Sequence, residues 1–358
     1  MATVVLAGGG TAGHIEPALA VARQWMKNNP SDKCIFLGTK SGLENTLVPA
    51  AGFELRLIPK VAISRTPSAS WLRIPFDLIS SVVSSIKVVR KGDVLVGFGG
   101  YVSAPAYLAA ALSRTPIVIH EANAKPGWAN RLGALFTSHL AVAHPVEQGK
   151  FSDALLAGLP LRSDVATACV ASASHWESAR TAAKARLGFP ADAPLVFIMG
   201  GSQGSLAINA VVAESVSTFN HKGISVLHSV GKLNALPPSK GGYKPVAYVD
   251  AMADAYLAAD VIIARSGAVT CSEFRALGRY ALFVPLPIGN GEQFVNAATL
   301  VADGRAEIVA QKEFTSDFIE AQIDRLLKVA AQAPINGDDQ DLDAAQKIVA
   351  LTEFAIKS

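Results

Sequence analysis

Short runs of apolar residues, many of them β-branched, alternate along the chain with longer alanine-rich stretches. Most of the runs are too short to be helices and are followed by glycine or polar residues, which is typical of buried strands. Their alternation with helical stretches predicts an α/β fold in which helices join parallel strands. In the first part of the chain the predicted strands are Thr3–Ala7, Cys34–Leu37, Val94–Gly97 and Pro116–His120.

The same alternation restarts near residue 195, after a weakly patterned alanine and serine stretch at 163–185. We therefore predict two Rossmann-like domains, 1–160 and 161–358, with parallel sheets that face a central cleft. The last helix is expected to return to the first domain. Ligands of such folds bind at the carboxyl ends of the strands. The later predicted strands are Leu195–Met199, Ser225–Ser229, Val246–Val249, Val261–Ala264 and Ala281–Pro285.

The composition is that of a folded protein with a large core. Of the 358 residues, 50% are hydrophobic and 17% charged, which excludes a disordered chain. No window approaches the roughly 18 consecutive apolar residues of a membrane-spanning helix. Met1 leads directly into a predicted strand, unlike a signal peptide. The three cysteines lack CxxC spacing, so we expect neither a disulfide framework nor a zinc site, and a reducing compartment fits.

Charge is distributed unequally between the two predicted domains. Residues 1–160 carry 15 Lys and Arg against 9 Asp and Glu, and residues 161–358 carry 17 against 20. The first domain therefore has a net charge of +6 and the second of −3. A modest positive charge suits phosphate groups or an anionic membrane surface. It is too weak for a nucleic-acid-binding face, so we expect no nucleic acid partner.

Four glycine-rich turns follow predicted strands and lead into predicted helices that begin near His14, Ala106, Gln203 and Thr270. Glycines let a backbone approach phosphate groups closely, and the N-terminus of a helix offers unpaired N–H groups to an anion. Four such turns at strand ends predict a site for a phosphate-bearing ligand. The turns are Gly8–Gly13, Gly97–Ser103, Gly200–Gly204 and Arg265–Thr270.

The first turn has the G-x-G-x-x-G spacing of a dinucleotide site, which suggests a nicotinamide or flavin oxidoreductase as one alternative. Such a site needs an acidic residue at the end of the second strand to hold the ribose. Here that strand ends in Phe36–Lys40, and the next acid is Glu44. His14, a titratable imidazole, stands where a dinucleotide site keeps a small residue. The context therefore argues against a dinucleotide.

Seven segments, in order and at matching spacing over nearly the whole chain, resemble the MurG family of peptidoglycan glycosyltransferases. The resemblance implies the two-domain GT-B fold and an inverting transfer of N-acetylglucosamine from UDP-N-acetylglucosamine. The implied acceptor is lipid I, an undecaprenyl-diphosphate-linked muramyl pentapeptide, and the implied product is lipid II; no cofactor is implied. The segments are Gly8–Ala20, Gly97–Ala106, His120–Arg131, Gly158–Val165, Met199–Asn209, Ala264–Glu273 and Gly291–Ala297.

The resemblance also implies donor-binding residues. Arg162 and Ser202 would hold the UDP phosphates, Val249 would contact uracil, and Glu273 would bind the ribose hydroxyls. The pair Glu292-Gln293 replaces a frequent pair of glutamines, and the segment 287–290 lacks a common histidine; both departures bear on sugar selectivity. The remaining donor-side residues are Thr11, Ala12, Gly13 and Asn123 near the sugar, Ala268, Val269, Thr270, Cys271 and Ser272 around the nucleotide, and Gln293 at the sugar hydroxyls.

The acceptor is expected on the first domain, beside Gly10, Gly100, Tyr101 and Asn130. Inverting transfer needs a general base for the acceptor hydroxyl, and a base is most effective when its pKa lies near the working pH. His14 is one candidate, although a histidine at a helix start can simply pack against a neighbour; Glu121 is the other. No Asp-x-Asp pair lies at a strand end, so we expect no essential metal. The run Asp338–Asp343 is expected to be a solvated helix start.

A possible membrane-facing segment lies in the first domain. Trp71–Phe76 combines aromatic residues with Arg73, and the helix that follows carries apolar Leu78–Ile86 positions with serines largely on the opposite face. We expect most of that helix face to pack on the sheet and Trp71–Phe76 to contact anionic lipid. This predicts peripheral association with the cytoplasmic side of the cell membrane.

Three other functions stay open at this stage. A UDP-sugar epimerase, or a transferase for another acceptor, would share the fold and the nucleotide site. A dinucleotide-dependent oxidoreductase would share only the first turn. A non-catalytic nucleotide-sugar-binding protein would have no need for both His14 and Gln293.

Overall fold

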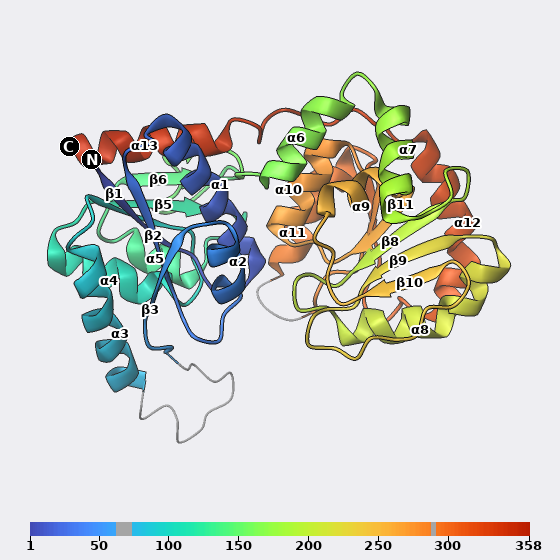
Figure 1. Ribbon diagram of the computed structural model, residues 1–358, viewed down its shortest axis with the longest axis horizontal. Coiled ribbons are helices and arrows are strands. Elements are labelled where there is room, and N and C mark those ends of the chain that lie inside the picture. Colours follow the sequence, from blue (N-terminus) through green and yellow to red (C-terminus); the bar gives the residue numbers. More distant parts are fainter. Residues whose placement is uncertain (62–73, 288–290) are drawn as a thin grey trace. The chain divides into compact units, whose positions relative to one another are not determined.

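The computed structural model describes residues 1–61, 74–287 and 291–358, and these form two compact α/β units (Figure 1). The first unit comprises Met1–Arg162 together with Gln340–Ser358, and the second comprises Ser163–Asp339. The chain thus passes from the first unit to the second and returns. The second unit begins two residues later than the expected domain 161–358 and ends at Asp339, and the last helix lies in the first unit, to which it was expected to return.

The first unit is built on a sheet of seven parallel strands in the order β3-β2-β1-β4-β5-β6-β7. Val4–Ala7 of β1 are fully buried, as expected for a parallel strand that helices cover on both faces. The strands are β1 (Thr3–Ala7), β2 (Lys33–Gly38), β3 (Glu54–Leu57), β4 (Val94–Gly97), β5 (Ile117–Glu121), β6 (His139–Val142) and β7 (Leu155–Leu156). The helices are α1 (Ala12–Asn28), α2 (Glu44–Ala50), α3 (Ile74–Val89), α4 (Ser103–Ser113), α5 (Trp128–Gly133) and α13 (Ala344–Lys357).

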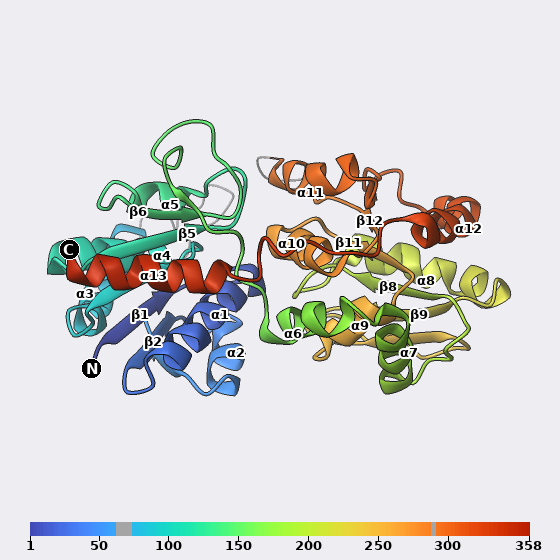
Figure 2. The same ribbon diagram turned by 90° about the horizontal axis from the view of Figure 1, so that it is seen from above.

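The returning helix α13 completes the core of the first unit. It lies alongside α1 and close to β5 and β6 (Figure 2). Ile348 and Val349 are fully buried in one cluster with Val4 and Leu19. The acidic run before α13 is not wholly solvated as expected: Asp341 is 1% exposed, and its carboxylate accepts a hydrogen bond from the Leu159 N–H at 2.8 Å. This contact joins the two passages of the chain at the border of the unit.

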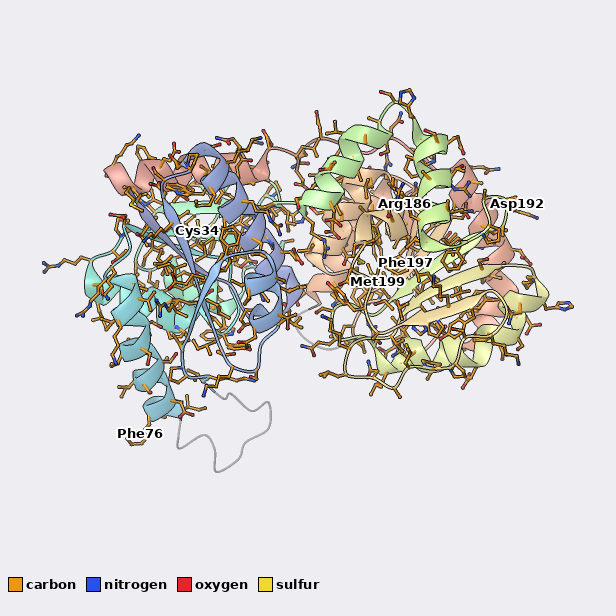
Figure 3. All side chains as sticks on the ribbon, viewed as in Figure 1. Cys34, Phe76, Arg186, Asp192, Phe197 and Met199 are labelled. Carbon is orange, nitrogen blue, oxygen red and sulfur yellow. The ribbon has the colours of Figure 1, made fainter. Side chains whose placement is uncertain are left out.

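The second unit has a six-stranded parallel sheet in the order β10-β9-β8-β11-β12-β13. Phe197 and Met199 on β8 are buried in its interior (Figure 3). Its strands are β8 (Leu195–Met199), β9 (Ser225–Ser229), β10 (Tyr243–Val246), β11 (Val261–Ala264), β12 (Ala281–Phe283) and β13 (Ala306–Ile308). Its helices are α6 (Ser163–Ser172), α7 (Trp176–Leu187), α8 (Leu206–His221), α9 (Met252–Ala258), α10 (Ala268–Leu277), α11 (Glu292–Ala302) and α12 (Ser316–Gln332).

Several predicted boundaries were wrong. The strand expected at Val246–Val249 is β10, which ends at Val246, and β12 ends two residues before the expected Pro285. Helix α8 begins at Leu206 and not near Gln203, because Ser205 acts as its N-cap and accepts a hydrogen bond from the Ile208 N–H. The weakly patterned stretch 163–185 forms α6 and most of α7.

Helix α3 packs only part of its expected apolar face in the core: Val82 is buried, and Leu78 and Ile86 pack against the same cluster. Ser81 and Ser85 lie on its buried face, where the Ser85 hydroxyl donates to the Ser81 carbonyl at 2.8 Å. Phe76, Ile79 and Val83 are exposed, and Phe76 points away from the unit in Figure 3. Residues 71–73 of the expected lipid-facing segment lie outside the described residues. Within the described ranges, no helix is long and apolar enough to cross a membrane.

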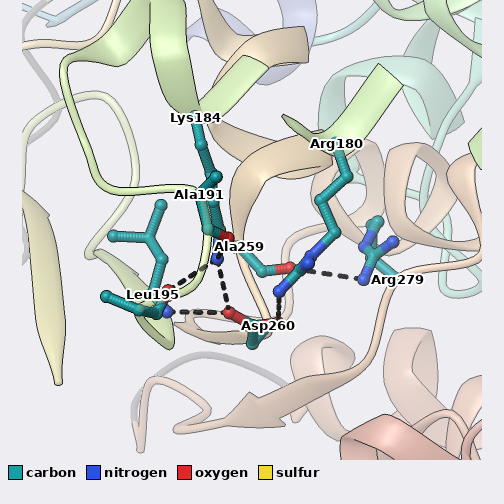
Figure 4. Close-up of polar contacts among 8 residues, drawn as sticks. Arg180, Lys184, Ala191, Leu195, Ala259, Asp260 and Arg279 are labelled. Carbon is teal, nitrogen blue, oxygen red and sulfur yellow. Dashed lines mark hydrogen bonds and ion pairs between the residues drawn. The ribbon is translucent and has the colours of Figure 1, made fainter. Parts of the chain in front are cut away.

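A partly buried polar cluster joins three elements at the amino ends of β8 and β11 in the second unit (Figure 4). The Asp260 carboxylate accepts hydrogen bonds from the Leu195 N–H at 2.8 Å, from Lys184 at 3.3 Å and from Arg180. The Lys184 ammonium is fully buried and also donates to the Ala193 carbonyl at 2.6 Å. Burial lowers the pKa of Lys184, while the adjacent Asp260 acts to raise it. Asp260 therefore compensates a charge that has no access to water.

We predict that Asp260→Ala destabilises the second unit by about 3 kcal/mol, because it leaves the buried Lys184 charge uncompensated. The matched control is Asp324→Ala, which removes an ion pair of Lys222 in which Asp324 is 57% exposed; its cost should stay below about 1 kcal/mol. Urea unfolding followed by circular dichroism measures both. Equal losses for the two variants would contradict this role of Asp260.

Candidate functional site

The strand order of the first unit changes direction between β1 and β4. In open parallel sheets, the crevice at such a switch point is the usual place for a ligand, at the carboxyl ends of the strands. The turns after these two strands are Gly8–Thr11 and Phe98–Val102, and both are glycine-rich. Two of the four turns singled out in the sequence therefore flank one switch point.

His14 lies in the first turn of α1, at this switch point. Its Nδ1 is 3.2 Å from the Thr11 hydroxyl oxygen. A Cβ atom on Gly100 would lie 3.1 Å from His14 Nδ1, and one on Gly99 would lie 3.4 Å from His14 Cδ2. The imidazole is half-buried. The side chain thus packs against the turn after β4 (the β4 turn, Phe98–Val102), at the edge where a ligand would bind, and part of its ring is accessible.

A buried carboxylate forms hydrogen bonds with the turn after β1 (the β1 turn, Gly8–Thr11). Glu44, which is fully buried, accepts hydrogen bonds from the Gly10 N–H at 3.1 Å and from the Thr39 N–H at 2.8 Å. Glu44, which lies too far along the sequence to hold the ribose of a dinucleotide, therefore stabilises the β1 turn from the protein interior. The Gly10 N–H is engaged, so any contact of Gly10 with an acceptor would involve other backbone atoms. Tyr101 lies over this glycine: a Cβ there would be 2.7 Å from its ring.

Glu121, the other candidate base, is 2% exposed at the end of β5. Its Oε1 accepts hydrogen bonds from the backbone and side-chain N–H groups of Asn123 at 2.9 and 3.1 Å. Its Oε2 accepts from the Gly127 N–H and the Asn130 amide, both at 2.9 Å. Burial raises the pKa of Glu121, and these four hydrogen bonds oppose that shift. A buried carboxylate with four donors is poorly placed to receive a substrate proton, so His14 is the better candidate.

Asn130, expected on the acceptor side, is 1% exposed. Its amide group donates to Glu121 and to the His120 carbonyl, and its oxygen accepts from the Tyr107 hydroxyl at 2.7 Å. Its polar atoms are therefore engaged inside the protein, which does not favour a direct contact with the acceptor. Asn123 is half-buried beside it.

Arg162 is the last residue of the first unit and pairs with α1. Its Nη1 lies 3.2 Å from Glu16 Oε1, and the two side chains are 15% and 9% exposed. The guanidinium, expected to bind UDP phosphates, is thus already oriented by an acid two residues from His14. Ala12 and Gly13, on the first turn of α1, are half-buried, whereas Thr11 is exposed.

The second unit has its own switch point, between β8 and β11. The turns that follow these strands are 200–205 and 265–267, the other two glycine-rich turns. We call the first of them the phosphate turn, because Ser202, the expected phosphate ligand, lies on it and is half-exposed. Helix α8 follows the phosphate turn, so its first N–H groups are directed toward the same edge.

Arg265 connects three of the segments that follow strands in the second unit. Its guanidinium is buried and donates to the Ser205 hydroxyl at 2.8 Å, to the Val284 carbonyl at 2.7 Å and to the Gln311 side chain at 2.6 Å. Burial lowers the pKa of Arg265. A charged group inside the protein is stable only when its hydrogen bonds are made, and here they tie the phosphate turn to its neighbours.

The other expected donor residues lie around the same edge. Ala268–Glu273 form the start of α10, with Val269 and Thr270 half-exposed. Glu273 is 2% exposed, and its carboxylate accepts from the Tyr256 hydroxyl at 2.7 Å. Gln293 is half-buried and accepts a hydrogen bond from the Leu286 N–H at 2.9 Å through its side-chain oxygen. Val249 is 6% exposed. The ribose and uracil assignments stay predictions.

Two residues that hold these turns have no role in the sequence-based predictions: Glu44 at the turn after β1 of the first unit and Arg265 at the turns of the second. Both are visible in the sequence as charges, but their partners lie in other segments of the chain and many are backbone atoms, which leave no trace in a motif. Within the described part of the chain, no three His, Cys, Asp or Glu side chains are grouped as metal ligands. The expectation of a metal-independent reaction stays a prediction.

Comparisons with known proteins agree with this architecture. Residues 4–142 match the model of the glycosyltransferase family 28 N-terminal domain, and residues 195–350 match that of the family 28 C-terminal domain. A relative from Thermobifida fusca is 43% identical, with 97% of this chain and 94% of the relative covered. It is named UDP-N-acetylglucosamine–N-acetylmuramyl-(pentapeptide) pyrophosphoryl-undecaprenol N-acetylglucosamine transferase.

Two solved structures are also similar. Acinetobacter baumannii MurG is 26% identical with a TM-score of 0.68, covering 99% of this chain and all of that one. A UDP-GlcNAc 2-epimerase from Neisseria meningitidis, solved with UDP-GlcNAc, covers 98% of this chain and 99% of its own, with a TM-score of 0.59; at 15% identity it shows a shared fold alone. The chain is an enzyme of the GT-B fold that belongs to glycosyltransferase family 28 and, within it, to the MurG family.

Proposed function

We propose that this enzyme transfers N-acetylglucosamine from UDP-N-acetylglucosamine to the muramyl 4-hydroxyl of lipid I, with inversion at the sugar C1, to form lipid II. The observation that carries the proposal is the 43% identity over 97% of the chain to a transferase of that name. The glycine-rich turns at both switch points support it, since donor and acceptor each carry a diphosphate and such turns suit phosphate groups.

In the proposed reaction the acceptor oxygen forms a bond to C1 of the donor sugar, and the bond from C1 to the β-phosphate oxygen breaks. UDP leaves with that electron pair, and the hydroxyl proton passes to His14. The Thr11 hydroxyl, 3.2 Å from Nδ1, fixes the ring so that Nε2 acts as the base. Glu121 positions the loop from Asn123 to Asn130 beside this ring through its four hydrogen bonds.

The departing UDP gains negative charge, which needs positive charge or N–H donors close to its phosphates. We assign this role to Ser202 and the first N–H groups of α8, with Arg162 as the cation. Gln293 would read the sugar hydroxyls and Glu273 the ribose. On the acceptor side, Gly100 and Tyr101 border the site, and the Lys60 ammonium lies 5.4 Å from the Tyr101 ring centroid, which adds positive charge for the second diphosphate.

We predict that UDP release from UDP-N-acetylglucosamine requires a lipid I analogue and needs no added divalent metal. The reason is that bond cleavage at C1 depends on the acceptor hydroxyl as nucleophile. Release is measured with a coupled assay for UDP, with and without the analogue. Acceptor-independent conversion of the donor would support an epimerase instead, and release that appears only with metal would contradict the proposed leaving-group stabilisation.

We predict that His14→Ala lowers kcat by about 10²–10⁴-fold while the KM for the donor changes little, because a general base acts only in the transition state. The control is Glu121→Gln. It replaces one acceptor oxygen of the carboxylate by an NH₂ group, which cannot accept the hydrogen bonds that this oxygen receives. It should lower the melting temperature and leave in place the acidic limb of the kcat/KM pH profile, where activity falls as the general base is protonated. If His14→Ala keeps turnover within a few-fold of the parent, His14 is not the base.

Peripheral association with the cytoplasmic side of the cell membrane is the second part of the proposal. Its support is the exposed row of Phe76, Ile79 and Val83 on α3, in the unit that contains the basic residues of the first 160 positions. Lys87, Arg90 and Lys91 follow the row and are all exposed. Apolar side chains next to cations favour anionic lipid headgroups.

We predict that Phe76→Glu lowers partitioning onto vesicles containing anionic phospholipid by at least about tenfold, because it removes an apolar contact and adds a repelled charge. The matched control is Val170→Glu on α6 of the second unit: Phe76 is 75% exposed and Val170 70%. Vesicle co-sedimentation at several salt concentrations measures both. An equal loss for the two variants would assign the effect to net charge and contradict a lipid-facing α3.

A further inference from the structure

The turn that follows β9 lies directly against the phosphate turn. Asn234, on this β9 turn, donates one N–H of its side-chain amide to the Gln203 carbonyl at 3.1 Å and the other to the Val230 carbonyl at 2.7 Å. Its own backbone N–H donates to the Gly231 carbonyl at 3.1 Å. A single half-buried side chain therefore joins the two turns and closes its own turn as well.

The two turns approach each other so closely that no side chain fits between them. Gly204 has φ +76°, and a Cβ there would overlap the Val230 carbonyl oxygen. Only glycine adopts this conformation readily and also leaves that space empty. The position of the phosphate turn is therefore set by the position of Val230, and any shift of one backbone moves the other.

Val230 is itself fixed from the core. The Asn209 amide on α8 donates to the same Val230 carbonyl at 2.9 Å, and the Asn209 oxygen lies 3.1 Å from His228 Nε2. His228 Nδ1 is 2.9 Å from the Tyr243 hydroxyl. Burial lowers the pKa of His228 to about 4, so the ring is neutral near pH 7 and these contacts do not change with pH in that range.

The β9 turn also reaches the segment expected to bind uridine. The Lys232 ammonium lies 4.6 Å from the centroid of the Tyr248 ring, and Tyr248 precedes Val249, the expected uracil contact. Contacts of a cation with an aromatic face contribute about 0.5–1 kcal/mol at exposed sites. Residues 230–234 thus touch the phosphate turn at one end and the uridine segment at the other.

We propose that Asn234 is a positioning residue for the donor diphosphate: it holds the phosphate turn in the conformation that binds UDP, and the β9 turn is part of the donor site. This inference rests on the proposed function, since it assumes that the phosphate turn binds UDP. Asn234 does not touch the reacting atoms. It acts on donor affinity through Gln203 and leaves the chemical step unchanged.

The test compares Asn234→Ala with the wild-type chain by calorimetric titration of UDP and by donor kinetics. Loss of a two-fold hydrogen bond to backbone should weaken UDP binding by about three- to tenfold and raise the KM for the donor by the same factor, with kcat within about twofold. Asn234→Ser has a shorter side chain whose hydroxyl donates a single hydrogen bond, so its UDP affinity should lie between those of the wild type and Asn234→Ala. It replaces the alanine variant in the test if that variant does not fold.

The matched control is Asn220→Ala. Asn220 likewise braces a turn, donating to the Lys240 carbonyl at 3.2 Å and accepting from the Gly242 N–H at 2.9 Å. It lies at the opposite end of α8, about 20 Å from the phosphate turn at 1.5 Å rise per residue. It should lower the melting temperature and leave UDP affinity within about twofold of wild type.

The outcomes separate the two proposals. If the wild-type chain binds UDP and a folded Asn234→Ala variant binds it with the same affinity, the role of Asn234 is overturned and the proposed function is left intact. Equal loss of affinity in Asn220→Ala also overturns it, because the effect would then follow stability alone. Absence of UDP binding by the wild-type chain overturns the proposed function together with this inference.

Discussion

The turns beyond the carboxyl ends of the strands carry backbone groups that no sheet partner can satisfy, and buried charged side chains satisfy them here. Glu121 accepts four N–H groups in the first unit, and Glu44 accepts the Gly10 and Thr39 N–H groups. Arg265 donates to four acceptors in the second unit. Since an ionised group inside a protein is costly unless fully hydrogen-bonded, each of these residues tolerates few arrangements of the turns around it.

Rigid turns suit the proposed chemistry. A hydrogen-bond donor of the protein that is already oriented when charge develops on the leaving phosphate needs no reorganisation at that moment. In both units the switch point places two glycine-rich turns side by side, so one sheet edge presents many backbone N–H groups in a small region. In the proposed mechanism Glu121, which accepts four hydrogen bonds, fixes a loop, and His14, beside Thr11 and the turn after β4, is the base.

Sequence reasoning was most accurate where one physical rule dominates. Fully buried parallel strands read as continuous apolar runs, so Thr3–Ala7, Val94–Gly97, Leu195–Met199 and Val261–Ala264 were predicted at their observed bounds. It was less accurate where the outcome depends on tertiary contact. Whether Ser81 or Ile79 of α3 faces the core depends on its packing against α4, and the alanine-rich stretch 163–185 has no strong period to mark its helices.

The same limit applies to the site. The MurG-like motifs located the residues at both switch points, but a motif does not show which of its polar side chains are consumed within the protein. Glu121 was an alternative to His14 as the base and Asn130 was expected to face the acceptor; their hydrogen bonds to one another and to other groups became visible only in the structure. Asn234 stands outside every motif, because its partners are the carbonyls of Gln203 and Val230.

The most direct test of the account is a crystal structure of this chain with UDP. The account predicts that the diphosphate lies within hydrogen-bond distance of Ser202 and the first N–H groups of α8, with the backbone from Gly200 to Ser205 and the Asn234 contacts unchanged. A diphosphate bound at the Gly8–Thr11 turn instead, or a phosphate turn that rearranges to receive it, would contradict the claim that buried polar side chains prepare this edge for the donor.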